Sequence, residues 1–502
     1  MAYYSIFPEK DTTLYSHPNR KLMNSGHDEI LELVKEKQND GNKHYPTRIL
    51  IKFSNEDIKD VIENKIGSSN FNSNTADVRL KLYSVQSKAL TSILNIESYP
   101  VSQSWHEGKG RYSNLPTSSD GTSWIYRDND IVKTKWMNDG SAYATITITN
   151  YAELNSTDKI NLIATDGTNY DFVNGDQSSV NGTWESTTSN EATATNLMNV
   201  INTSSGPAGT RFNATVDGAV VTVTQATGGT AGNTTVTLTD TGTAGMTATS
   251  FTDGNTVSFY PGTTGSISSS LLQEGGGNWW TGSGFMSSQQ FINSDNFDTD
   301  LEVLDVVRKW SGSLFASSTY PDGIENNGFI IKKPNSIESA VSSSFGEIQY
   351  FSVDTHTIYP PRLVFKWDDS IHEYQSSAKT SGELDVSLYR NRKEYNQNDV
   401  ALFRVNVRDK YPTRTFTTSS NYINAGYFTT SSYYSVRDAY TEEEIIPIDT
   451  SYTKMSADGE GMYFKLYMKS FQPERYYRIL FQHENNDGTT IYDNDYIFKV
   501  IR

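Results

Sequence analysis

Few residues in this sequence could catalyse a reaction. It has no cysteine, and therefore no cysteine nucleophile, thiolate zinc site or disulfide framework. Its seven histidines are isolated from one another. His106 and Glu107 are adjacent, and adjacent residues on a strand point to opposite faces, so this pair is not expected to form a site. His372 and Glu373 lack the second histidine that a helical zinc motif requires.

The carboxylates gather in turn-like sequence. Asp and Asn support turns by bonding to nearby backbone, and residues 485–488 (Asn-Asn-Asp-Gly) predict a hairpin. The alternative is a structural Ca²⁺ held by Asp and carbonyl oxygens, although the spacing does not match an EF-hand loop. The sequence assigns no metal ligands and predicts no organic cofactor. The acidic clusters are Asp298 with Asp300, Asp368 with Asp369, Asp487, and Asp493 with Asp495.

The common catalytic signatures are missing. The sequence contains no Gly-x-Ser-x-Gly in a strand-turn-helix context, no phosphate loop and no dinucleotide fingerprint. Glycoside cleavage would need two carboxylates from distant strands, and nothing in the sequence points to such a pair. We therefore predict that the chain is not an enzyme.

Two adjacent tryptophans, Trp279 and Trp280, follow three glycines at 275–277. Exposed indoles could stack on sugar rings, which makes both residues candidate glycan contacts. The alternative is structural, with one ring in the core and the other at a domain contact. Because adjacent strand residues face opposite ways, at most one of the pair is expected in the core. The structural interpretation is favoured.

Composition narrows the class of protein. A chain of 502 residues is expected to hold more than one domain. Its 12% aromatic content, with 31 tyrosines, is typical of β-rich proteins. The net charge of −17, with scattered Lys and Arg, argues against nucleic acid as a partner. The first residues do not resemble a signal peptide, and no stretch is apolar enough for membrane insertion.

The elements that must position these residues are mainly strands. Residues 3–53 alternate polar and apolar, and residues 76–83 alternate cleanly. Residues 30–34 are interpreted as a strand. Residues 55–66 place Ile58, Val61, Ile62 and Ile66 at helical spacing, with Ser54 as a cap, and predict a short helix.

One ordered set of motifs resembles a known family. Residues 104–110 (Ser-Trp-His-Glu-Gly-Lys-Gly), expected to end a strand at Trp105, precede a Gly-Thr-Ser-Trp at 121–124. An Asp-Val-Val-x-x-Trp at 305–310 and an Asn-Gly-Phe-Ile-Ile-Lys at 327–332 follow. This order resembles the DNRLRE family of extracellular β-sandwich modules. The resemblance covers residues 11–139 and 256–368. It implies a jelly-roll β-sandwich over 1–139 plus 256–368, with Arg48 opening an early core strand.

The segment between these halves has a different composition, rich in Thr, Ala, Asn and Gly. Residues 159–165 and 170–173 predict a hairpin around Asp166-Gly167, and residues 189–201 predict a helix. Strands are expected at 212–216, 219–224 and 234–239. This order resembles a small Thr/Gly-rich module of bacteriophage tail and fibre proteins. We expect residues 140–255 to form an inserted α+β domain.

Residues 369–502 predict a third region, an immunoglobulin-like β-sandwich. Clean period-2 strands are expected at 386–389, 400–407, 463–468, 476–481 and 496–501. Residues 411–439 are Ser/Tyr-rich and are expected to form a long loop lying on a partner. The candidate assembly surface consists of Tyr411, Tyr422, Tyr427, Tyr433 and Tyr434.

Together these features predict a mainly β, non-enzymatic bacteriophage virion protein of the tail, neck or baseplate periphery. Its partners would be other virion proteins, in a homo-oligomer or a symmetric repeat of the particle. Assembly in the host cytoplasm would explain an extracellular type of module without an export signal. The alternative is a host-glycan or receptor-binding protein of the virion. A polysaccharide-degrading tailspike is a weaker rival, because no β-helix repeat is visible.

Overall fold

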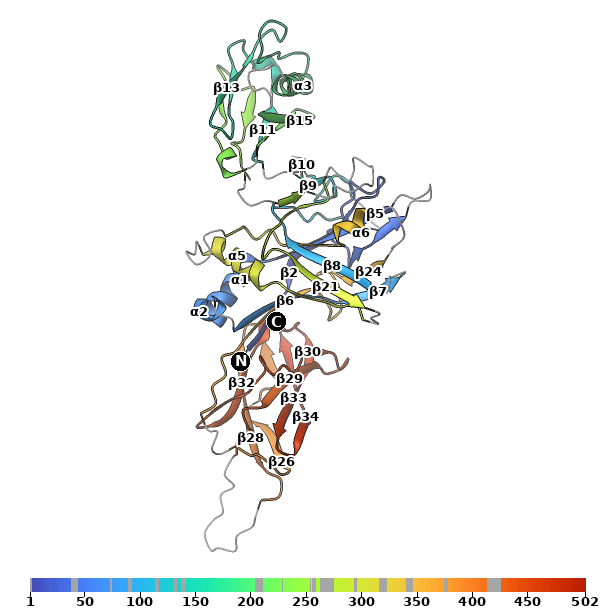
Figure 1. The fold of residues 1–502 in the computed structure, drawn as a ribbon, viewed down its shortest axis with the longest axis vertical. Coiled ribbons are helices and arrows are strands. Elements are labelled where there is room, and N and C mark those ends of the chain that lie inside the picture. The colour runs from blue at the N-terminus through green and yellow to red at the C-terminus, as the bar shows by residue number, and fades with distance from the viewer. Residues whose placement is uncertain are drawn as a thin grey trace.

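A computed structural model shows three β-rich bodies in a row (Figure 1). The central body holds residues 2–136, 259–261 and 275–367, the insert holds residues 141–252, and the C-terminal body holds residues 378–501. Both termini lie where the central and C-terminal bodies meet, and the insert lies at the far end (Figure 1). The structure describes all residues except 1, 38–43, 73–74, 89–92, 113–116, 131–132, 137–140, 204–210, 228, 253, 255–258, 262–274, 293–295, 316–322, 340–345, 374–377, 390 and 413–425.

The mainly β class is confirmed, with 46% strand and 13% helix. In the central body, one sheet has the order β1-β25-β6-β22 and the other β2-β5-β23-β8-β21. The first consists of β1 (Ala2–Ile6), β25 (Arg362–Trp367), β6 (Ala76–Leu82) and β22 (Thr299–Glu302). The second consists of β2 (Pro8–Tyr15), β5 (His44–Phe53), β23 (Phe329–Lys332), β8 (Ile93–Pro100) and β21 (Ser287–Ile292), and β4 (Lys35–Lys37) pairs with β5.

Three smaller sheets complete the central body. They are β3 (Ile30–Leu33) with β24 (Glu347–Phe351) and β7 (Ser84–Lys88), β9 (Tyr126–Asp128) with β10 (Thr134–Lys135), and β19 (Phe259–Pro261) with β20 (Asn278–Trp280). The expected strand at 30–34 is confirmed by β3. The expectation of a strand ending at Trp105 is wrong, because β8 ends at Pro100 and the chain then turns irregularly.

Strands from before and after the insert are interleaved in both main sheets. For example, β25 pairs with β1 and β6, and β23 pairs with β5 and β8. One apolar core fills the space between the sheets, and a second, smaller core covers the other face of the β2-β5-β23-β8 region. On β23, Phe329 and Ile331 enter the first core and Ile330 enters the second. This sheet is therefore buried on both faces.

The helices of the central body flank the sheets. The expected helix at 55–66 is confirmed, and the Ser54 side chain caps it by accepting from the Asp57 amide. Its second half is π-helical, which the sequence did not indicate. The helices are α1 (Asn55–Asp60), η1 (Val61–Ile66), α2 (Ser68–Asn72), α5 (Leu304–Leu314) and α6 (Asn335–Ser339).

Among its described residues, the insert has two four-stranded sheets and one α-helix, and its apolar core consists of residues between 142 and 251. The expected Asp166-Gly167 hairpin joins β12 to β13, and the expected helix is α3, capped by Ser189. One sheet is β15 (Phe212–Asp217), β16 (Val220–Gln225), β11 (Tyr143–Ile148) and β18 (Met246–Ala248). The other is β14 (Thr183–Trp184), β13 (Asn169–Asn174), β12 (Lys159–Ile163) and β17 (Thr237–Thr239), with α3 (Asn190–Ile201), η2 (Tyr151–Glu153) and η3 (Thr230–Gly232) beside them.

The C-terminal body is a pair of antiparallel-rich sheets around a separate core, which also takes in Tyr3 and Val364. All five expected strands are present, and Asn485 pairs with Gly488 to close the expected hairpin. One sheet is β26 (Leu384–Tyr389), β28 (Val400–Asp409), β32 (Gly461–Tyr467) and β31 (Ser456–Asp458). The other is β27 (Glu394–Asn396), β34 (Gly488–Ile501), β33 (Arg475–Asn485), β29 (Ser432–Asp438) and β30 (Glu444–Ile446), and η5 (Met468–Ser470) follows β32.

Candidate functional site

The polar loop at 104–123 is organised by one buried side chain, that of Asn24. Its amide nitrogen donates to the carbonyl oxygens of Glu107 at 2.6 Å and Thr122 at 2.8 Å. Its amide oxygen accepts from the backbone N–H of Gly26 at 3.1 Å and Gly110 at 2.8 Å. All four hydrogen-bonding positions of the amide are therefore used, and they join three segments that are distant in the sequence.

The glycines of this loop are required by the close approach of the chain to Asn24. A Cβ at Gly110 would lie 2.1 Å from the Asn24 carbonyl oxygen. Gly108 has φ of +79° and Gly121 has φ of +65°, a conformation that other residues rarely adopt. The glycines of the motif at 104–110 are thus explained by packing and backbone geometry.

Two carboxyl groups with raised pKa values lie beside this loop. Glu107 accepts from the Asp11 backbone N–H at 3.1 Å, and Asp11 accepts from the Val353 N–H at 2.7 Å. Burial raises the pKa of Glu107 to about 7 and that of Asp11 well above its ordinary value. One Asp11 oxygen has no hydrogen-bond partner among the described residues. A raised pKa favours the protonated form of each carboxyl group.

Metal binding was tested on the described part of the chain. No group of three or more His, Asp or Glu side chains there is arranged to hold a metal ion. The Asp487 turn forms the hairpin between β33 and β34. Asp298 accepts from the Ser84 backbone N–H at 2.7 Å, and Asp368 from the Ser370 N–H at 2.9 Å. Asp368 thus bonds locally, as turn residues do, whereas Asp298 bonds to a distant strand, and a structural Ca²⁺ stays a prediction.

The structure also contains a buried charged cluster that the sequence did not indicate. Arg48 and Glu338 are fully buried and pair at 2.7 Å, and Lys332 lies 3.7 Å from the same carboxylate. Arg48 also donates to the Gly276 carbonyl at 2.6 Å and lies over the Trp124 ring at 4.7 Å. No solvent reaches these groups, so they tie β5, β23 and α6 together rather than act on a ligand. In the sequence, the only indication of this cluster was a basic residue, Arg48, at the start of an apolar run.

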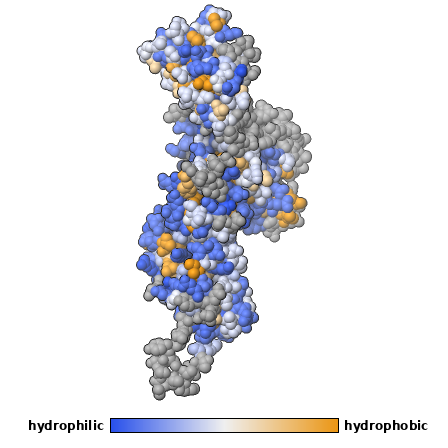
Figure 2. Space-filling view, turned by 60° about the vertical axis from the view of Figure 1, so that its left-hand side comes forward, coloured by the Kyte–Doolittle hydropathy of each residue, from blue (hydrophilic) through white to orange (hydrophobic). Residues whose placement is uncertain are grey.

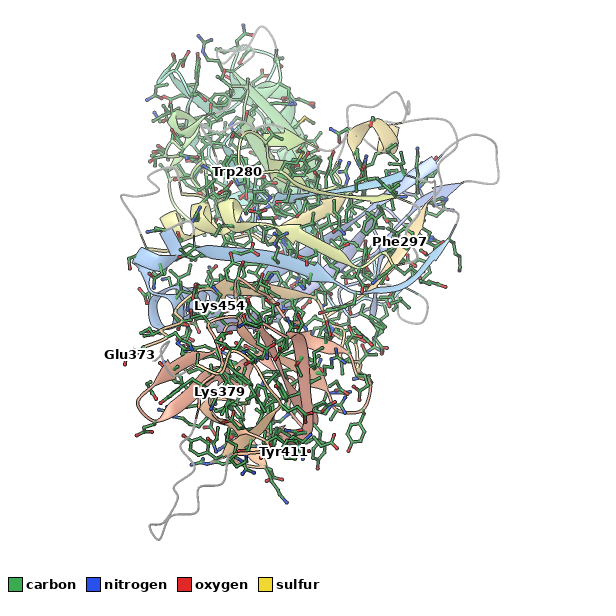
Figure 3. The ribbon with its side chains drawn as sticks, turned by 60° about the horizontal axis from the view of Figure 1, so that its bottom comes forward. Trp280, Phe297, Glu373, Lys379, Tyr411 and Lys454 are labelled. Carbon is green, nitrogen blue, oxygen red and sulfur yellow. The ribbon has the colours of Figure 1, made fainter. Side chains whose placement is uncertain are left out.

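The tryptophan pair is not exposed. Trp279 is 1% and Trp280 is 5% accessible, so the expectation that at most one lies in the core is wrong. The rings do face opposite ways, but Trp279 belongs to the smaller core and Trp280 to the larger one. Figure 3 labels Trp280 in the central body. Because both faces of β20 are covered, neither ring can stack on a sugar here.

The described histidines have different surroundings, although His372 and His483 both lie beside Phe428. His106 is half exposed, with its Nδ1 atom 3.8 Å from Asp120 and 3.9 Å from Asp128, a pairing that the sequence did not suggest. His372 bonds to the Phe428 carbonyl at 3.2 Å. His483 is buried against the Phe428 ring, and burial lowers the pKa of His483 to about 4.

The tyrosines expected at an assembly surface lie in different environments. Tyr411 is 77% exposed, and Figure 3 shows it at the end of the C-terminal body away from the central body. Tyr427 is half-buried and bridges to Ala378. Tyr433 and Tyr434 are buried in β29, so their assignment to an exposed loop is wrong. Tyr422 lies outside the described residues.

Comparison with known proteins adds no identity: no family model, no curated protein and no solved structure matches the chain. Among the described helices, none is long and apolar enough to cross a lipid bilayer.

Proposed function

We propose that this chain is a non-enzymatic structural protein of a bacteriophage virion, placed at the periphery of the tail, neck or baseplate. The observation that carries the proposal is the extended row of three β-rich bodies, with the insert distal to both termini (Figure 1). Such a shape suits a protein that is anchored near one junction and contacts neighbours along its length. The jelly-roll connectivity of the central body and the immunoglobulin-like connectivity of the C-terminal body are part of this proposal.

Exposed apolar strand residues support assembly contacts. Val400 is 53% and Leu402 is 44% exposed, and both side chains lie on the same face of β28. Figure 2 shows apolar residues as small, separate patches on the face that it displays. Small patches favour several modest contacts in a repeating assembly over one large hydrophobic interface.

An open strand edge supports the same role. β34 pairs with β33 along most of its length, but with β27 only at Lys499–Ile501. Ile491, 55% exposed, lies on the part of β34 that no described strand covers on that side. A free edge offers unpaired backbone groups to a neighbouring chain.

The proposal is tested on particles. The chain should be detected by mass spectrometry in virions purified from cultures that produce it, and antibodies against it should label the tail or neck region in electron micrographs. A Val400→Lys/Leu402→Lys double variant should be incorporated less, whereas Val180→Lys, at a 65% exposed position in the insert, should be incorporated normally. Absence of the wild-type chain from purified particles would overturn the proposal.

The alternative role is recognition of a host glycan. Trp279 and Trp280 cannot be its contact residues, because both rings are buried. That role therefore requires a different surface.

A further inference from the structure

A cleft of about 490 Å³ lies between the insert and the central body. One wall is the outer face of β15 and β16, and the other is formed by the β9–β10 ribbon and Trp136. Figure 1 shows this ribbon at the junction of the two bodies. The volume falls within the range of about 300–1,000 Å³ that is usual for small-ligand sites.

The wall contributed by the insert is polar. Asn213, Thr215 and Asp217 alternate along β15, and Thr222 and Thr224 lie opposite Thr215 and Asn213 on β16. Cross-strand partners share a face, so these side chains project together toward the cleft. None of the five makes a side-chain hydrogen bond to another described residue. They present hydroxyl, amide and carboxylate groups that are available to a ligand.

The opposite wall supplies an aromatic ring. Tyr126 is half-buried in the cleft, where desolvation and the charge of Asp217 raise the pKa of its phenol. Trp136 lies beside it, and its indole N–H donates to the Ser123 carbonyl at 3.0 Å, which fixes the ring. Lys133 and Lys135 line the same wall.

A direct contact holds the two walls in register. Arg127, next to Tyr126 on β9, lies 5.4 Å from the Tyr143 ring of the insert and hydrogen-bonds to the Tyr143 hydroxyl. Its guanidinium also donates to the Ser104 carbonyl of the central body at 2.9 Å. The contact between Arg127 and Tyr143 therefore links the central body to the insert beside the cleft.

We propose that this cleft binds an oligosaccharide that carries an acidic sugar. A sugar ring has hydroxyl groups around its edge and an apolar C–H face, which match the polar strand wall and the Tyr126 ring. Two lysines and one aspartate line the cleft, so it is locally cationic although the whole chain carries −17. A carboxylate on the ligand would pair with Lys133 or Lys135. This role goes beyond the structural function and does not depend on it.

The test is a glycan array that contains neutral and acidic oligosaccharides, probed with the purified full chain. We expect binding to acidic members, and we expect Tyr126→Ala to weaken it by about tenfold or more, as truncation of an aromatic anchor does. Thr215→Trp should abolish binding, because an indole at this exposed strand position fills the cleft without disturbing the core.

Matched controls separate site effects from general ones. Thr247→Ala changes a threonine on the same sheet outside the cleft, and Tyr440→Ala removes an exposed ring in the C-terminal body. Both should bind as the wild type does, and circular dichroism should show every variant folded. The proposal is overturned if no glycan binds, if only neutral glycans bind, if binding survives Thr215→Trp, or if single-stranded nucleic acid binds in the cleft instead.

Discussion

Asn24 is the residue on which the loop at 104–123 depends. Replacing it with alanine removes four hydrogen bonds and leaves buried backbone groups of Glu107, Thr122 and Gly110 without their partner. We expect Asn24→Ala to lower the free energy of unfolding by about 2–4 kcal/mol, since buried unsatisfied groups are costly. Urea denaturation measures the change. Asn199→Ala, at an exposed position of α3, is the control and should alter stability by less than about 0.5 kcal/mol.

The carboxylate of Glu107 predicts a pH dependence of stability. Its folded-state pKa of about 7 lies above the unfolded value, so the folded state holds more protons between pH 4.5 and 7. Stability from this group is fully present below pH 4.5 and is lost as the pH rises through 7. Asp11, whose pKa is also raised, acts in the same direction.

Glu107→Gln should remove that contribution while keeping an acceptor for the Asp11 N–H. We expect the variant to be more stable than the wild type at pH 8, by about 1–2 kcal/mol after allowance for partial exposure, and equal to it at pH 4. Thermal unfolding at both pH values measures the difference between the two proteins. An equal effect of the substitution at pH 4 and pH 8 would show that folding does not shift the pKa of Glu107.

At the scale of elements, the cap of α3 is a local and testable stabiliser. The Ser189 hydroxyl accepts from the Ala192 N–H at 3.1 Å, one of the amides that a helix leaves unpaired at its start. We expect Ser189→Ala to destabilise the insert by about 1 kcal/mol and Ser189→Asp to retain most of the stability. Hydrogen exchange of the α3 amides would report the change. Equal protection in wild type and Ser189→Ala would contradict it.

The elements that were predicted correctly are those whose sequence patterns lie within the element itself. Period-2 strands such as β28 and β33, the Asp166-Gly167 hairpin, and the helices capped by Ser54 and Ser189 depend on neighbouring residues alone. Helix α5 was not predicted, although its buried residues Leu304, Val307 and Trp310 recur at helical spacing. Its start carries no capping signal, because its N-cap, Val303, makes no side-chain hydrogen bond. Its amphipathic face is fixed by burial of Trp310 in the larger core.

The errors at the candidate sites have one physical cause. The two-residue repeat of a β-strand implies that Trp279 and Trp280 face opposite ways. It does not show whether both faces of the strand are covered by other segments. Coverage depends on distant segments, as does the burial of Tyr433 and Tyr434 in β29. The cleft beside Tyr126 was missed for the same reason, because its two walls are separated by about eighty residues of sequence and meet only in the folded molecule.

At the scale of the whole molecule, the two described ends of the insert meet beside the central body. Tyr143 and Thr252 exchange two backbone hydrogen bonds of 2.9 Å, so the beginning and end of the insert lie side by side. The insert also closes its own core, whereas the central body shares residues such as Tyr467 with its C-terminal neighbour. The two junctions therefore differ in kind: the first has the polar contact of Arg127 with Tyr143, and the second is a packed apolar interface.

This difference predicts the outcome of a deletion. Replacing residues 141–254 with a short glycine linker should leave the central and C-terminal bodies folded, because the main sheets pair strands from both sides of the insert without using it. Circular dichroism and limited proteolysis of the product should show retained β structure and a protected core. The isolated segment 141–254 should fold by itself and show the helical signal of α3. Unfolding of the flanking strands in the deletion product would mean that the insert is an integral part of the central body.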